Sequence, residues 1–371
     1  MKILALSLLR IGDFFQHVQF LNEVAARNPE AHLHVVAFAD IKSIQNLFPK
    51  WSFHFIPRLE IQRDFVEKDR PWYRGLYLLE SALAEVFATE WSLVLNPTQT
   101  GFSARLMDCL QAQEKRGTQF LNGQTAGWNQ DLHFLNDYYQ ALPKPELSWI
   151  ELTSRSLGFE LPHAKFARVR THGEIWLNPT TSDARKDWPL ANWKNLASSL
   201  KSQDLPVRVL GAPGDQQWLE TEFQGFEIGA WKFQDVKNYG KNCRLLISGD
   251  TSTPHLLALQ QVPMLTLFLG PANDFKTAPR LYNSSILATR AHCAPCGHRG
   301  ACTQERQICS DTISVLDVLQ VTEFHLQERA RAEVNLSALA EWRILGELHE
   351  SKNDTRQTAS RTAHSSMAGT A

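Results

Sequence analysis

The stretch from Arg244 to Pro271 constrains the fold of this chain more than any other. It reads RLLISGDTSTPHLLALQQVPMLTLFLGP, in which two apolar, β-prone runs, Leu245 to Ile247 and Met264 to Leu269, flank an apolar helical segment. This order predicts a strand, a helix and a parallel strand, with Thr253 as the helix N-cap and Pro254 as the first helical residue. Ligands of open parallel sheets bind just past the strand ends, where free helix N–H groups suit a phosphate. An ordinary capped helix without a ligand fits the stretch equally well.

The length and composition of the chain limit its fold class and its partners. Its 371 residues are enough for two domains of ordinary size. The net charge of -1, with 43% hydrophobic and 21% charged residues, argues against a disordered chain and against a general nucleic-acid binder. No apolar run reaches the roughly 18 residues that span a bilayer. The opening MKILALSLLR predicts a buried strand rather than a signal peptide, because Arg10 and Asp13 stand where a small-residue cleavage site belongs.

The N-terminal half opens with a β-α-β pattern. Ile3 to Leu9 predicts a central strand, the segment from Ile11 predicts a helix, and Leu33 to Phe38 predicts a second strand, so we expect a Rossmann-like α/β domain. The first turn holds one glycine and no GxGxxG, so it implies no dinucleotide. Asp13 places a carboxylate at the helix start, above the strand ends. It either takes part in chemistry there or merely favours the helix dipole.

The second half repeats the order of strands and helices. Leu161 to Gly173 has few periodic apolar residues and predicts an interdomain linker, whereas residues 53–74 lack a firm period and predict a surface excursion. From these patterns we expect two doubly wound α/β domains, a C-terminal amphipathic helix and a disordered tail. Their predicted ranges are 1–165, 170–322, 323–350 and 351–371, in that order.

A second polar constellation follows the strand predicted at Ile175 to Leu177. Asn178 to Ser182 and then Lys186 bring three hydroxyls and one ammonium group together after the strand. The hydroxyls can hold a phosphate by directional hydrogen bonds and the lysine can do so as a point charge. Taken alone, such a segment is most often a plain polar loop.

Four of the six cysteines lie in one short segment. They are Cys293, Cys296, Cys302 and Cys309, spaced C-x2-C-x5-C-x6-C. Four thiolates this close could form a tetrahedral structural site for zinc or iron, and the first pair has the usual metal spacing. The other two gaps are not those of a standard zinc ribbon. A bound metal ion, free thiols and disulfides therefore all remain open.

Four of these segments recur in the same order in one family, and the chain resembles the family 9 glycosyltransferases. These are the ADP-heptose-dependent heptosyltransferases of lipopolysaccharide assembly and their relatives. The resemblance runs from Met1 to about Leu319 and rests on ILALSLLRIGDFFQHV, NPTTSDARKDWPLANW, VLGAPGDQQW and SGDTSTPHLLALQQVPMLTLFLGP. It implies a GT-B architecture, in which two Rossmann-like domains face one another across a cleft. The N-terminal domain would hold the acceptor and the C-terminal domain the nucleotide sugar.

The resemblance also implies roles for individual residues. Asp13 would be the catalytic base of an inverting transfer, which needs no cofactor because a lysine and a helix N-terminus can stabilise the departing diphosphate. The residues expected around the diphosphate and ribose of the donor are Thr181, Ser182, Lys186, Asp250, Thr251, Ser252 and His255. Two positions depart from the family pattern: Ser252 replaces a usual glycine, and Asn178-Pro179 replaces a Pro-Gly or His-containing turn.

The function implied is the transfer of a sugar from a nucleoside-diphosphate donor to an acceptor. The resemblance implies that the donor is ADP-heptose and that the acceptor is lipopolysaccharide or another surface glycan. The resemblance implies a cytoplasmic protein, leaves peripheral contact with the inner membrane open, and implies no nucleic-acid partner. Three alternatives remain: a protein-modifying heptosyltransferase, a nucleotide-sugar-binding protein without catalysis, and an interaction protein centred on the cysteines.

Overall fold

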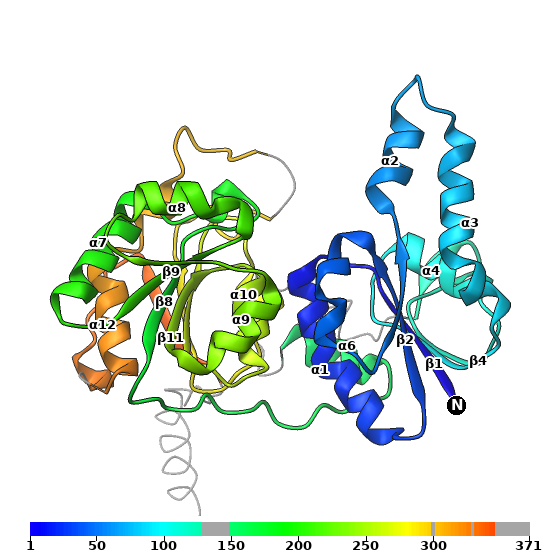
Figure 1. Cartoon of the computed structure of the whole chain (residues 1–371), viewed down its shortest axis with the longest axis horizontal. Coiled ribbons are helices and arrows are strands. Elements are labelled where there is room, and N and C mark those ends of the chain that lie inside the picture. The colour runs from blue at the N-terminus through cyan, green and yellow to red at the C-terminus, as the bar shows by residue number, and fades with distance from the viewer. Residues whose placement is uncertain (128–147, 298–300, 328–329, 346–371) are drawn as a thin grey trace, which may run out of the picture.

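The computed structural model describes residues 1–127, 148–297, 301–327 and 330–345. Within this part of the chain the secondary structure forms two separate α/β domains, each built on its own sheet (Figure 1). This confirms the predicted fold class. None of the helices in the described residues has both the length and the apolar character needed to cross a bilayer.

The N-terminal domain is built on a five-stranded parallel sheet in the order β3-β2-β1-β4-β5. Its strands are β1 (Lys2–Ser7), β2 (His32–Phe38), β3 (Ser52–Ile56), β4 (Trp91–Asn96) and β5 (Ala112–Gly117). The other elements are α1 (Ile11–Arg27), the 3-10 helix η1 (Ala39–Leu47), α2 (Arg58–Val66), α3 (Trp72–Ala88), α4 (Gly101–Cys109), α6 (Trp149–Ser156) and the hairpin β6 (Gln119–Leu121) and β7 (Gln124–Ala126). The central strand is β1, whose residues 3–6 are all buried, because a parallel strand covered on both faces needs a continuous apolar run.

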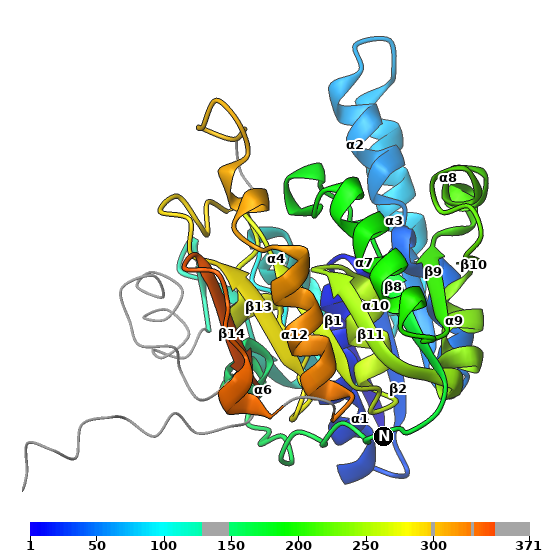
Figure 2. The same ribbon diagram turned by 90° about the vertical axis from the view of Figure 1, so that its left-hand side faces the viewer.

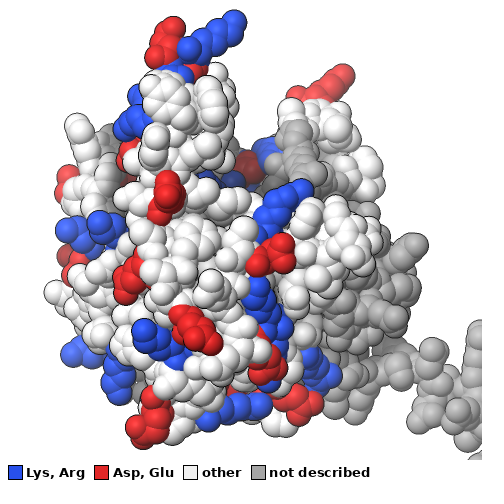
Figure 3. Space-filling model, turned by 90° about the vertical axis from the view of Figure 1, so that its right-hand side faces the viewer, with Lys and Arg blue, Asp and Glu red and all other residues white. Residues whose placement is uncertain are grey.

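The segment predicted as a surface excursion, residues 53–74, holds most of strand β3, all of α2 and the start of α3. The helices α2 and α3 project away from the sheet (Figures 1 and 2). The buried carboxylate of Asp64 in α2 ties them together by accepting hydrogen bonds from Arg70 (3.3 Å) and Arg74 (3.1 Å). Figure 3 looks at this side of the molecule, where charged side chains of both signs are interspersed. A helix that is exposed on most of its surface needs no regular apolar stripe, which explains why the residues of α2 gave no firm period.

The C-terminal domain is built on a seven-stranded sheet in the order β10-β9-β8-β11-β12-β13-β14. Its strands are β8 (Glu174–Asn178), β9 (Val207–Gly211), β10 (Glu227–Ala230), β11 (Cys243–Gly249), β12 (Met264–Phe268), β13 (Ser285–Thr289) and β14 (Ala340–Ile344). Its helices are α7 (Leu190–Ser202), α8 (Gln216–Glu222), α9 (Phe233–Tyr239), α10 (Ser252–Ala258), α11 (Asp274–Thr277) and α12 (Val315–His325). The stretch from Arg244 to Pro271 thus forms most of β11, then α10 and β12, which confirms the predicted strand, helix and strand.

The predicted C-terminal helix over residues 323–350 is wrong in the part that the structure describes. Helix α12 ends at His325, and residues 340–344 form β14, which pairs antiparallel with β13 (Figure 2). Ala340 and Ile344 of β14 are buried, and the indole N–H of Trp342 donates to Ser285 Oγ (2.8 Å). The apolar residues that suggested a helix instead alternate along a strand, because the open edge of β13 gains a backbone partner. The predicted disordered tail, 351–371, lies outside the described residues.

The two domains contact each other through α1, α9 and α10. The rings of Phe15 in α1 and Phe233 in α9 lie edge to face, with centroids 5.6 Å apart. A further link is the buried Arg280 of the C-terminal domain, which donates to Glu151 Oε1 (2.7 Å) in α6 and to Gln19 Oε1 (3.3 Å) in α1.

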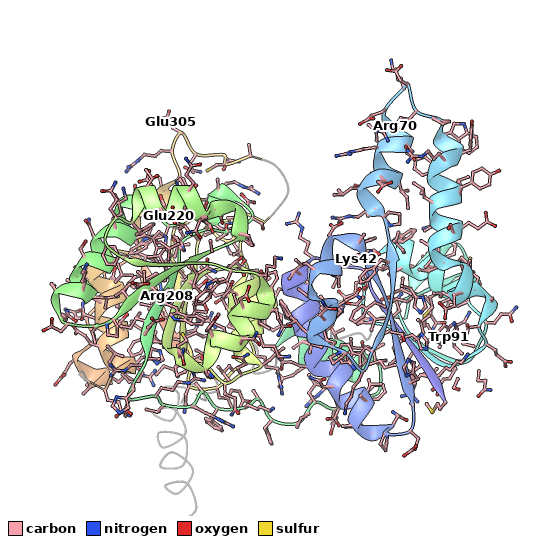
Figure 4. The ribbon with its side chains drawn as sticks, in the orientation of Figure 1. Lys42, Arg70, Trp91, Arg208, Glu220 and Glu305 are labelled. Carbon is pink, nitrogen blue, oxygen red and sulfur yellow. The ribbon has the colours of Figure 1, made fainter. Side chains whose placement is uncertain are left out.

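Figure 4 labels Arg70 at the tip of the helical hairpin and Glu305 on the segment that follows the first cysteines, and both project from the same side of the molecule.

Candidate functional site

Asp13 lies where the two domains meet. It is the third residue of α1, directly after the turn that follows β1, and its carboxylate accepts a hydrogen bond from the backbone of Arg10. Asp13 therefore lies in the first turn of the helix, as predicted. The same turn also faces the other domain, since a Cβ added at Gly12 would lie 3.6 Å from His255 Cδ2 and 3.7 Å from Ser252 Cα. The first turn of α1 thus packs against the first turn of α10.

A buried ion pair forms the centre of the site on the C-terminal domain. Lys186 Nζ donates to Asp250 Oδ2 at 2.5 Å, and the two side chains are only 10% and 5% exposed. Lys186 comes from the loop after β8 and Asp250 directly follows β11. These strands are neighbours in the sheet, so their carboxyl ends place the two side chains together.

The electrostatic environment shows that Asp13 is close to this ion pair. Burial raises the pKa of Asp13 above its ordinary value, and the negative charge of Asp250 raises it further, against the opposing influence of Lys186 and Arg10. Burial also lowers the pKa of His255 to about 4, so its imidazole is neutral at pH 7. The Nδ1 atom of His255 is buried and has no hydrogen-bond partner among the described residues. The structure therefore brings Asp13, Lys186, Asp250 and His255 together from both domains.

The loop from Thr181 to Asp187, here called the donor loop, is held by its own polar groups. The Thr181 N–H donates to Asp187 Oδ1 (3.0 Å), and the Thr181 hydroxyl donates to the Asp183 carbonyl (2.9 Å). Hydrogen bonds from Arg185 lower the pKa of Asp183 to about 2, so its carboxylate is ionised. Ser182 is exposed. The loop packs on the end of β11 at Gly249, where a Cβ would come within 2.8 Å of Thr181 Cγ2. A larger residue at position 249 would therefore press against the Thr181 side chain, a contact that the sequence did not reveal.

The start of α10 differs by two residues from the prediction. Thr251 is the N-cap and Ser252 is the first helical residue, so Pro254 occupies the third position. A proline is tolerated throughout the first turn, because the N–H groups there have no carbonyl partner four residues earlier. The Thr251 side chain accepts no capping hydrogen bond, and both Thr251 and Ser252 are partly exposed. Their hydroxyls can therefore face a ligand.

The cysteine segment lies against the donor loop. A Cβ at Gly270 would lie 3.2 Å from Cys309 Sγ and 4.0 Å from Cys296 Sγ, so these two sulfurs surround the same glycine. Gln307 donates to the Arg185 carbonyl (2.7 Å) in the donor loop. Burial raises the pKa of Cys309, and the nearby Cys293 and Cys296 raise it further. All six cysteines are free thiols, and among the described residues no three His, Cys, Asp or Glu side chains are placed to hold a metal ion.

A comparison with protein families matches the middle part of the chain. Residues 126–306 match the model of glycosyltransferase family 9 (heptosyltransferase). This range includes the donor loop and all of the expected donor residues, whereas Asp13 lies before it. A search of the curated proteins gives no match.

Solved structures with the same fold include three from E. coli. Heptosyltransferase WaaC with ADP is 14% identical with a TM-score of 0.63, over 88% of this chain and 100% of that chain. WaaC with ADP-2-deoxy-2-fluoro heptose is 14% identical with a TM-score of 0.57, over 87% and 99%. ADP-heptose lps heptosyltransferase II is 15% identical with a TM-score of 0.57, over 89% and 100%. These likenesses establish the GT-B fold, and residues 126–306 of this chain carry the match to glycosyltransferase family 9.

Proposed function

We propose that this glycosyltransferase moves a heptose from ADP-heptose to a surface glycan or glycolipid with inversion at the anomeric carbon. The observation that carries the proposal is the meeting of Asp13 with the Lys186–Asp250 pair across the domain boundary. An inverting transfer needs a base and a leaving-group site on opposite sides of one carbon, and here they come from opposite domains. The choice of donor is supported by WaaC, whose solved structures hold ADP and an ADP-heptose analogue.

The proposed reaction has one step of bond exchange. The acceptor hydroxyl attacks the anomeric carbon and Asp13 takes its proton, while the bond to the diphosphate breaks and its electron pair stays on the leaving oxygen. The raised pKa of Asp13 makes its carboxylate a stronger base than an ordinary aspartate. Lys186 would stabilise the negative charge of the leaving diphosphate as a fixed cation.

The remaining donor contacts are proposed from the placement of the polar groups. Thr251 and Ser252 at the start of α10, together with Ser182 in the donor loop, would donate hydrogen bonds to phosphate or ribose oxygens. Thr181, whose N–H and hydroxyl already donate within the loop, would keep the loop in shape beside the donor. The neutral His255, whose Nδ1 lacks a partner among the described residues, would gain one from the donor. Asp250 would hold Lys186 in place rather than contact the phosphate, since two anions repel.

Nucleotide-sugar binding gives the first test. ADP and ADP-heptose at 100 times their dissociation constants should each stabilise the protein by about 2.7 kcal/mol, seen as a rise in Tm by thermal shift. UDP-glucose serves as the mismatched donor and should give a smaller shift at the same concentration. A larger shift with UDP-glucose than with ADP-heptose would contradict the proposed donor.

Catalysis and the class of acceptor need a second measurement. ADP release from ADP-heptose should accelerate when truncated lipopolysaccharide is added, and the acceptor should gain the mass of one heptose. Acceleration only by a protein fraction would favour the protein-modifying alternative. Binding of ADP-heptose without transfer to any acceptor would favour the catalysis-free alternative.

We further propose that the enzyme works in the cytoplasm at the face of the inner membrane, where a glycolipid acceptor would be accessible.

The structural zinc or iron ion predicted from the cysteine spacing stays a prediction. The thiols of Cys296 and Cys309 lie beside Gly270, but the described residues do not form a ligand set as they lie. We expect elemental analysis of the purified protein to find close to one zinc or iron ion per chain, and Cys296→Ser to lose it. Cys243→Ser is the matched control, because Cys243 is a thiol buried in β11 outside the segment. A folded wild-type protein with no metal would contradict the prediction.

A further inference from the structure

Two side-chain clamps hold the connection between β1 and α1, which carries Asp13. The first clamp is Thr98, a fully buried residue that follows β4. Its Oγ1 accepts a hydrogen bond from the Leu8 N–H (3.0 Å) and donates one to the Leu6 carbonyl (2.7 Å). One hydroxyl therefore fixes the chain at the end of β1 and in the turn that leads to Asp13.

Thr98 is itself held on both sides by buried polar groups. Its N–H donates to Asn96 Oδ1 (3.1 Å), and its carbonyl accepts a hydrogen bond from Ser103 Oγ (2.7 Å). The Asn96 side chain in turn donates to the Thr118 carbonyl (2.6 Å). These three neighbours are at most 2% exposed. Buried polar groups are costly unless they are paired, so a fully paired network rigidly defines the position of the Thr98 hydroxyl.

The second clamp joins the last residue of β1 to the second turn of α1. Ser7 Oγ and His17 Nδ1 are hydrogen bonded at 2.8 Å, and both residues are buried. Burial lowers the pKa of His17 to about 4, so the ring is neutral at pH 7. His17 lies four residues after Asp13, on the same face of the helix. The two clamps thus act on either side of Asp13, one on the turn before it and one on the helix after it.

We propose that Thr98 and the Ser7–His17 pair are positioning residues that set the Asp13 carboxylate against the donor pocket of the other domain. The inference rests on the proposed role of Asp13 as the base. Because the first turn of α1 packs on the first turn of α10, a shift of this turn changes the distance between Asp13 and the Lys186–Asp250 pair. Small displacements of reacting groups have large effects on rate, about 100-fold for about 1 Å.

Substitutions that remove only the hydroxyls test the inference. Thr98→Val keeps the shape of the side chain and loses both hydrogen bonds, so we expect kcat to fall ~100-fold with the donor KM and ADP affinity nearly unchanged. Ser7→Ala should act in the same direction, and Thr98→Ser should restore most of the rate. The controls are Thr322→Val and Ser154→Ala, which remove equally buried hydroxyls that donate to the Val318 carbonyl in α12 and to the Phe159 carbonyl just after α6. Both controls should keep the wild-type kcat.

A titration of Asp13 tests the inference without any substrate. In protein labelled with carbon-13 at aspartate carboxyl groups, the Asp13 signal is assigned by its loss in Asp13→Asn. In Thr98→Val the midpoint of this signal should shift by several tenths of a pH unit or more from the wild-type midpoint, because the carboxylate leaves its environment. An unchanged midpoint, or a loss of kcat as large in the controls, would overturn the proposal. If wild type turns over no donor, the proposed function fails. The titration alone then tests whether the two clamps position Asp13.

Discussion

Replacing Asp13 with asparagine should lower kcat by about 10²–10⁴-fold, because the amide keeps the shape of the side chain but cannot take a proton. ADP affinity should stay almost unchanged, since Asp13 belongs to the acceptor side of the site. The wild-type kcat should rise with pH as the Asp13 carboxyl loses its proton, with a midpoint above the ordinary aspartate range. Rates and isothermal titration with ADP measure both effects. Full transfer activity in Asp13→Asn would refute the assigned base.

The same substitution should stabilise the fold. The pKa of Asp13 is raised in the folded state, so its stabilising contribution is present below the ordinary value of 3.8 and is lost as pH rises through the raised value. Ionising the buried carboxyl above that pH therefore costs free energy that asparagine avoids. We expect Asp13→Asn to have a higher Tm than wild type at pH 7 and no gain below pH 3.8. A lower Tm at pH 7 would mean that Lys186 outweighs burial and Asp250.

Lys186→Ala should weaken ADP binding by about 1.5–3 kcal/mol, because one charged hydrogen bond to phosphate is lost. It should also lower the free energy of unfolding by about 3–5 kcal/mol, since Asp250 is left buried without its cation. Calorimetry with ADP and chemical denaturation measure the two effects separately.

Two variants act as controls for this result. Asp250→Asn removes the buried anion, so in the Lys186→Ala background it should recover part of the lost stability but not the lost ADP affinity. Lys201→Ala removes an exposed lysine that donates to the Gly225 carbonyl, and it should leave ADP binding unchanged. Wild-type ADP affinity in Lys186→Ala would show that Lys186 has no contact with the diphosphate.

The strands and the fold class could be predicted because buried parallel strands leave an unbroken signal. The runs at Ile3 and at Leu245 are apolar at consecutive positions, since both faces of each sheet are covered by helices. A strand paired on one edge gives a weaker signal. In β14 the alternation from Ala340 to Ile344 spans only five residues and resembled the end of an amphipathic helix.

The site could be predicted only in part. The resemblance gave Asp13, Lys186, Asp250 and His255, but no local pattern shows that residues so far apart in sequence meet at a domain boundary. The buried Lys186–Asp250 pair is a tertiary contact between two loops, so the sequence around either residue does not indicate which residue it contacts. Thr98 is a polar residue that follows strand β4. Its partners are backbone groups of β1 and the following turn, which composition cannot reveal.

The late position of β14 in the chain has a consequence for synthesis. Fifty residues separate the end of β13 at Thr289 from the start of β14 at Ala340. At about 5–20 residues per second, a ribosome needs roughly 3–10 s to make them. During that interval the hydrogen-bonding edge of β13, with the apolar residues Ile286 and Leu287, has no strand to pair with. The nascent chain is therefore most exposed to edge-to-edge association in this window, and a holding chaperone would be most useful there.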